Sequence, residues 1–132
     1  MSIRALISPR PLRLATATLA LLSLAACNPF AGPAAGARIY DQSCAGCHGT
    51  DATGGPGGPD LTVLTAREGE FPRRAVLNRL DGYGRGLAGD DMPNLGDLMT
   101  GRLMHVDLGR GASRMMPERV VALAAYLESI QR

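Results

Sequence analysis

The chain has 132 residues, with 14 basic and 12 acidic side chains and a formal net charge of +2 at neutral pH. All the basic residues are Arg, and no run of like charges stands out. The sequence therefore lacks the basic tract that is typical of proteins that bind nucleic acid. With no Trp, two Phe and three Tyr, it predicts one small domain whose polypeptide core lies near the lower limit for comfortable stability.

Residues 1–26 have the pattern of a secretory signal peptide, because three Arg precede an apolar run that is too short and wrongly flanked to span a membrane. The run ends in Leu24-Ala25-Ala26-Cys27, which resembles the lipobox of bacterial lipoproteins. The resemblance implies that Cys27 becomes the acylated first residue of the mature chain, and more than one acyl chain would anchor it stably. The alternative is ordinary signal cleavage that leaves Cys27 as a free thiol.

Removal of this segment would leave eleven Arg against twelve acidic residues, a net charge of −1. The apparent basicity of the whole chain is therefore no sign of a nucleic-acid partner. Residues 27–35, rich in Pro, Ala and Gly, are predicted to form a tether between the lipid and a folded domain over residues 36–132.

The pentad Cys44-Ala45-Gly46-Cys47-His48 has the C-x-x-C-H spacing at which haem is attached covalently. Thiols two residues apart can each add to a haem vinyl group, and the imidazole that follows lies beneath the iron. The sequence therefore predicts one haem c, bound through Cys44 and Cys47, with His48 as an axial ligand. A thioredoxin-type pair would need a βαβ context that is not visible, and a zinc site would have only the distant Cys27 and His105 to add.

Most of the predicted secondary structure is helical. Short helices are expected over residues 36–44, 61–67 and 72–80, and the Gly- and Pro-rich run 54–59 is expected to form a loop around the porphyrin edge. Residues 81–91 should be irregular, and residues 101–114 favour a hairpin or an ordered loop over a helix. Pro117 precedes the clearest helix, residues 118–130, which has an apolar stripe on one face.

The chain resembles the class I (mitochondrial-type) monohaem cytochromes c, in a bacterial lipoprotein form, over about residues 36–131. Gly36, Tyr40 and Cys44 have the family's Gly-x3-aromatic-x3-Cys spacing, and Tyr126 stands where the family has an aromatic residue in its last helix. The resemblance implies an all-α fold of three to five helices around one covalently bound haem. It also implies that the terminal helices cross, with Gly36 close to Leu123 and Tyr126.

Gly58-Pro59-Asp60-Leu61 resembles the family's Gly-Pro-x-Leu segment. The resemblance implies that the Pro59 carbonyl accepts the Nδ1 proton of His48, which fixes the ring and raises its basicity as a ligand. Tyr83 and Arg85 are candidates to bind a haem propionate, because Arg stays charged and offers paired donors to a carboxylate.

Met92 is the predicted sixth ligand, because Asp91-Met92-Pro93-Asn94-Leu95-Gly96 resembles the Met-Pro-x-aromatic-Gly segment that carries this ligand in many bacterial family members. The run from Met92 to the last helix is longer than is usual in the family. Alternatives are Met115 or Met116, His105 in a bis-His haem, and an open site. Met99 and Met104 are interpreted as core or haem-wall residues.

These features predict a lipid-anchored carrier of single electrons on the periplasmic face of a bacterial membrane, exchanging electrons with redox partner proteins. No small-molecule substrate and no nucleic acid are expected as partners. Two alternatives stay open: a haem c subunit of a larger respiratory oxidoreductase, and a haem enzyme or gas sensor with a labile sixth ligand.

Overall fold

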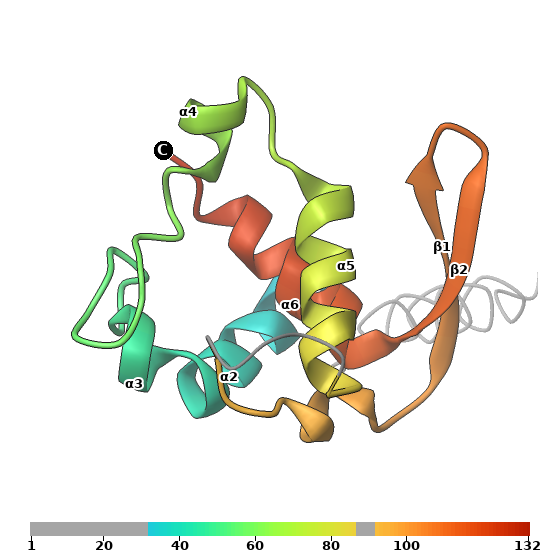
Figure 1. The fold of residues 1–132 in the computed structure, drawn as a ribbon, viewed down its shortest axis with the longest axis horizontal. Helices are drawn as coiled ribbons and strands as arrows, with labels where there is room; N and C mark the ends of the chain where they lie inside the picture. Colours follow the sequence, from blue (N-terminus) through green and yellow to red (C-terminus); the bar gives the residue numbers. More distant parts are fainter. Residues whose placement is uncertain (1–31, 87–91) are drawn as a thin grey trace, which may run out of the picture.

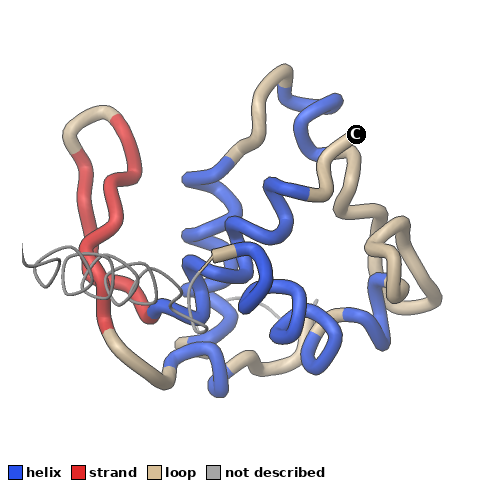
Figure 2. Tube along the Cα trace, turned by 180° about the vertical axis from the view of Figure 1, so that it is seen from behind, coloured by secondary structure: helices blue, strands red, loops and turns tan. Residues whose placement is uncertain are grey.

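The computed structural model describes residues 32–86 and 92–132, so the predicted signal peptide and Cys27 lie outside the described part. Helices pack around a central core, and a β-hairpin projects from one side (Figures 1 and 2). The elements are α2 (Pro33–Ser43), α3 (Ala45–His48), α4 (Leu64–Glu68), α5 (Arg73–Gly84), the 3-10 helix η2 (Gly96–Met99), β1 (Leu103–Gly109), β2 (Ala112–Pro117) and α6 (Glu118–Ser129). None of the helices in these residues is long and apolar enough to cross a bilayer.

Helices α2 and α6 cross in direct contact, and this crossing organises the core (Figure 1). Gly36 lies at the crossing point: a Cβ added there would collide with the Ala122 carbonyl and would lie 2.6 Å from Cβ of Tyr126. One turn further along α2, the rings of Tyr40 and Tyr126 pack with their centroids 5.4 Å apart. The predicted contact between Gly36 and the Tyr126 region of the last helix is confirmed.

The core is built mainly from apolar side chains of α2, α5, η2 and α6, and the hairpin adds Val106 and Met116. On α6 the buried positions recur at helical spacing, as the sequence predicts, because one stripe of the helix faces the interior. Pro117, at the N-cap, and Glu118, in the first turn, suit the start of a helix. The largest fully buried side chains are Tyr40, Leu77, Leu98, Met116, Leu123 and Val120.

The long run before α6 forms an antiparallel hairpin, β1–β2, in which Leu103 pairs with Pro117 at the base. The hairpin predicted for this region is confirmed, although its second strand runs on to Pro117. The amide of Glu118 donates to the carbonyl of Arg102 at 2.9 Å, so the chain leaves the helical body and returns to it at neighbouring points. On the face of the hairpin that also carries the buried Val106, Arg114 donates to Asp81 of α5 at 3.0 Å. This hydrogen bond ties the hairpin to the helices.

Helix boundaries differ from the sequence prediction in three places. Helix α2 begins at Pro33, three residues before Gly36, because Pro is well suited to a first helical turn. Helix α4 begins at Leu64 instead of residue 61. The prediction of irregular structure is wrong for residues 81–84, where α5 continues to Gly84. There Asp81 and Tyr83 are buried against other elements, and this tertiary packing outweighs the low helix propensity of Gly.

Replacing Gly36 by Ala is expected to destabilise the mature protein, although Ala is the better helix former. The added methyl meets backbone of α6, which cannot move aside cheaply, and overpacking of this kind costs about 1–3 kcal/mol. Thermal unfolding followed by circular dichroism measures the loss. Ala34→Leu enlarges an exposed position of the same helix and should change the melting temperature little. A Gly36→Ala variant as stable as wild type would contradict the close crossing.

Candidate functional site

The pentad of the sequence folds as the single turn α3, directly after α2. The amides of Cys47 and His48 both donate to the carbonyl of Cys44, at 3.1 and 2.9 Å. Both thiols are free; that of Cys44 is buried and that of Cys47 is exposed. Burial raises the pKa of the Cys44 thiol to about 11. The turn therefore presents two unpaired sulfur atoms and one imidazole from five consecutive residues.

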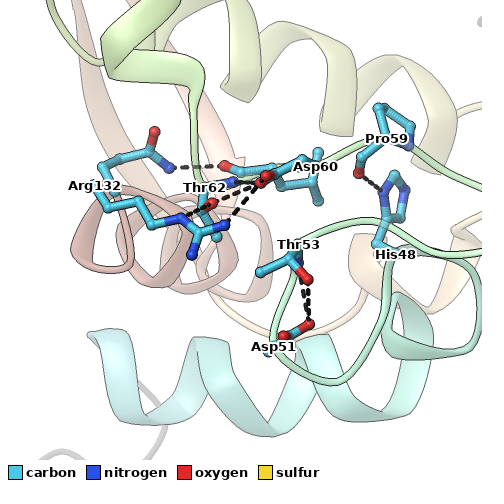
Figure 3. A network of polar contacts seen from close by, with 9 residues as sticks. His48, Asp51, Thr53, Pro59, Asp60, Thr62 and Arg132 are labelled. Atoms are coloured by element: carbon cyan, nitrogen blue, oxygen red, sulfur yellow. Dashed lines mark hydrogen bonds and ion pairs between the residues drawn. The ribbon is translucent and has the colours of Figure 1, made fainter.

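The imidazole of His48 is buried, with 6% of the residue exposed, and its Nδ1 lies 2.9 Å from the carbonyl oxygen of Pro59 (Figure 3). A carbonyl can only accept, so this contact requires the proton on Nδ1 and leaves the Nε2 lone pair available to a metal. Gly58 packs against the ring: a Cβ there would lie 2.5 Å from Cε1. The contact between His48 and Pro59 is the one that the resemblance implies.

A cavity of about 620 Å³ adjoins this imidazole, between the α3 loop, α5 and α6. Apolar side chains make up most of its wall, and Cys44, His48 and Pro59 also line it. Such a space suits a bulky apolar group with a metal at its centre, so the residues present fit a haem. The larger aliphatic side chains among the lining residues are Leu61, Leu64, Val76, Leu80, Leu123 and Leu127.

Met92 is half-buried and lines the same cavity as His48. The other candidate ligands do not line it. Met99 packs against Gly84, where an added Cβ would collide with its side chain. Met116, fully buried, and Met104 are paired across the hairpin.

His105 and Met115 are also paired across the hairpin, and both are exposed. Met115 is 48% exposed. Neither of them lines the cavity, so among the candidate sixth ligands in the described residues only Met92 lines it together with His48.

Only one of the two predicted propionate partners lines the cavity. Tyr83 is buried and lines the cavity, but Arg85 does not: its Nε donates to Asp81 at 2.9 Å. Arg79, which the sequence interpretation missed, lines the cavity one turn before Tyr83. Its guanidinium carbon lies 5.8 Å from the centroid of the Tyr83 ring. The i, i+4 spacing of Arg79 and Tyr83 on one helix was the signal that could have identified it.

The chain that follows His48 is fixed by a tyrosine hydroxyl and by two short turns. The hydroxyl of Tyr40 donates to the carbonyl of Gly49 at 2.6 Å, which fixes the chain just after His48. The carboxylates of Asp51 and Asp60 each accept from the amide and hydroxyl of a Thr two residues later. These hydrogen bonds lower the pKa of both carboxyl groups.

A buried imidazole with a fixed tautomer, two free thiols with two residues between them and an apolar cavity define a helical protein built to hold covalent haem. The sequence matches the family model described as Cytochrome c over residues 33–131. The chain belongs to the cytochrome c family: it is an electron-transfer protein, not an enzyme, and its cofactor is covalently bound haem c. The small helical fold predicted from the sequence is confirmed, with the hairpin added to it.

The chain is also similar to a protein of Sinorhizobium medicae (strain WSM419) named Cbb3-type cytochrome c oxidase subunit FixP. The two are 31% identical over 103 residues, which cover 73% of this chain. The match covers 29% of the relative, so this chain corresponds to less than a third of that protein's length. No solved structure matches the chain at a comparable level.

Tyr40→Phe is expected to lower stability at neutral pH by about 1 kcal/mol, because the Gly49 carbonyl loses its donor. It should also change the alkaline profile. Burial raises the pKa of Tyr40 from 10.0 to about 12, so its contribution is complete below pH about 10 and is lost as the pH rises toward about 12. Denaturant unfolding across this range measures both effects. Parallel profiles for wild type and variant would contradict the assignment.

Proposed function

We propose that this protein carries single electrons through a haem c bound by Cys44 and Cys47, with His48 and Met92 as axial ligands of the iron. The observation that carries the proposal is the cavity that has both the buried His48 ring and Met92 in its wall. Haem c, when attached, supplies an iron that changes between Fe(II) and Fe(III) by one electron.

The residues around the cavity supply binding, orientation and exclusion of water. The carbonyl of Pro59 accepts a hydrogen bond from Nδ1 of His48, so the ring presents Nε2 in a fixed orientation. Pro93 stiffens the backbone beside Met92, which limits how far the thioether can swing away. A thioether ligand favours Fe(II) over Fe(III) and raises the reduction potential relative to a second imidazole. Two strong ligands that remain bound in both oxidation states favour electron transfer over ligand binding.

Met92→Ala is expected to remove the weak far-red absorption band that marks sulfur ligation of ferric haem, and to lower the reduction potential. Both changes follow from the loss of the thioether. Optical spectroscopy and potentiometric titration of the mature haem-loaded protein measure them.

Met115→Ala is the matched control, because that side chain is exposed on the hairpin and away from the cavity. It should have the spectrum and potential of the wild type. Loss of the far-red band in Met115→Ala with its retention in Met92→Ala would overturn the ligand assignment.

We further propose that Cys27 carries lipid and anchors the domain to the periplasmic face of a bacterial membrane. The lipobox-like run before Cys27 supports this, and helix α2 begins only six residues later, at Pro33. At about 3.5 Å per residue, so short a connection would keep the domain within about 20 Å of the lipid. Its redox partners would then be proteins of the membrane or of its surface.

A second candidate function is that of a haem c subunit in a larger respiratory oxidoreductase. The likeness to a protein named as a cbb3-type oxidase subunit favours it. The hairpin, with Leu103 and Met115 exposed on its outer face, offers an apolar surface for a neighbouring subunit.

Cys27→Ser is expected to move the protein from the membrane fraction to the soluble periplasmic fraction and to lower the mass of the mature chain by that of its acyl groups. Fractionation and mass spectrometry of the protein from its bacterial host measure both, with wild type as the reference. Unchanged mass and fractionation would contradict lipid attachment. In a wild-type detergent extract, elution as one small species supports the carrier, and co-elution with other subunits supports the second candidate.

A further inference from the structure

The segment that follows Pro59 is fixed by two residues beyond α6, Gln131 and Arg132. The backbone amide of Arg132 donates to the carbonyl of Thr62 at 3.0 Å, and its Nε donates to the Thr62 hydroxyl at 2.8 Å. A terminal nitrogen of the same guanidinium reaches the Asp60 carboxylate at 3.3 Å (Figure 3). Arg132 thus contacts both residues that close the turn after Pro59.

Gln131 adds a second set of contacts to the same segment. Its side-chain amide donates to the carbonyl of Leu61 at 2.8 Å and to that of Leu127, on α6, at 2.6 Å. Its side-chain oxygen accepts from the amide of Thr65 at 2.9 Å. One side chain therefore joins the end of α6 to Leu61 in the loop and to Thr65 in the first turn of α4.

These contacts matter because the loop has little regular structure of its own. Residues 49–63 hold no helix. Before Pro59 the loop is tied to the pentad, because the amides of Gly54 and Gly57 donate to the carbonyls of His48 and Cys47 at 2.9 and 3.4 Å. After Pro59 the amide of Leu61 donates to the carbonyl of Ala52 at 2.8 Å. The Pro59 carbonyl, which accepts from His48, is bonded directly to Asp60. Its position therefore depends on how firmly the turn at Asp60 and Thr62 is held.

The polar core of this turn is the hydroxyl of Thr62, a residue that is 3% exposed. It donates to Asp60 at 2.6 Å and accepts from Arg132 at 2.8 Å. The ion pair between Arg132 and Asp60 is largely open to solvent, with 62% of the Arg side chain exposed, so it contributes little. Most of the restraint comes from the hydrogen bonds to the buried Thr62.

We infer that Arg132 is a positioning residue, which acts through Thr62 to hold the Pro59 carbonyl against Nδ1 of His48 and thereby sets the donor strength of that imidazole toward the haem iron. The inference rests on the proposed ligation by His48. The family match ends at residue 131, so Arg132 lies outside the matched segment.

The direction of the effect follows from the hydrogen bond. A well-placed carbonyl draws the Nδ1 proton and makes the imidazole a stronger donor, which stabilises Fe(III) and lowers the reduction potential. Weakening the restraint should therefore raise the potential. Deletion of a nearby positive charge alone would act in the opposite direction, because it favours the more positive, oxidised iron. The sign of the shift separates positioning from simple electrostatics.

The test uses neutral substitutions at Thr62 beside the change at Arg132 in the haem-loaded protein. Thr62→Val removes the hydroxyl at constant shape and charge, and Thr62→Ser restores it. We expect a rise in midpoint potential and faster solvent exchange of the His48 Nδ1 proton in Thr62→Val and in Arg132→Ala, with values near wild type in Thr62→Ser. Because both residues act as one unit, the double variant should shift no further than Thr62→Val alone.

Arg110→Ala is the matched control, because it removes the same charge at the exposed turn of the hairpin. It should leave the Nδ1 exchange rate unchanged. A fall in melting temperature in Thr62→Val and Arg132→Ala without a change in potential or exchange would overturn the inference, as would a fall in potential in Arg132→Ala. Failure of the proposed function would be distinct, since wild type itself would then lack the spectrum of a His-ligated low-spin haem.

Discussion

The close approach of α2 and α6 at Gly36 is the constraint from which the rest of the site follows. Helix α2 ends at Ser43, immediately before Cys44, so the angle at which it crosses α6 determines where the thiols and His48 lie. Helix α6 forms the opposite part of the cavity wall through Leu123 and Leu127. A side chain at residue 36 would separate the helices and so change the width of the cavity itself.

Three contacts within the chain restrain the imidazole of His48. Tyr40 fixes the backbone just after it through Gly49, Gly58 packs against its ring, and Pro59 accepts its Nδ1 proton. The last two belong to a loop with little regular structure, which is tied to the end of α6. Both terminal helices therefore act on this ring: α2 leads into the turn α3 that carries His48, and the residues that follow α6 hold the loop that orients it.

The pentad, the glycine at the helix crossing and the apolar stripe of α6 were predictable, because each has a fixed local spacing set by haem attachment or by helix geometry. The continuation of α5 through residues 81–84 was not, since Gly content favours a loop until the burial of Asp81 and Tyr83 is known. Arg85 was predicted as a propionate partner from the charge and paired donors of Arg alone, and in the structure its Nε donates to Asp81 instead.

The role of residues beyond α6 left no local pattern in the sequence. Gln131 and Arg132 are separated by 66 to 72 positions from the groups of residues 60–65 that they contact, and such pairs arise only from the tertiary fold. Their residue types, an amide and a guanidinium after a helix, are equally typical of a solvent-exposed chain segment.

A hydrogen bond joins Arg102 and Glu118 at the base of the hairpin. The two strands between them therefore leave the helical body and return to it at almost the same point. A change in length at the exposed tip of the hairpin, residues 109–111, would leave the buried Val106 and Met116 in place and so would not move α6. Sequence changes at the tip of the hairpin therefore offer a way to alter the partner proteins that bind the molecule while the environment of its iron stays the same.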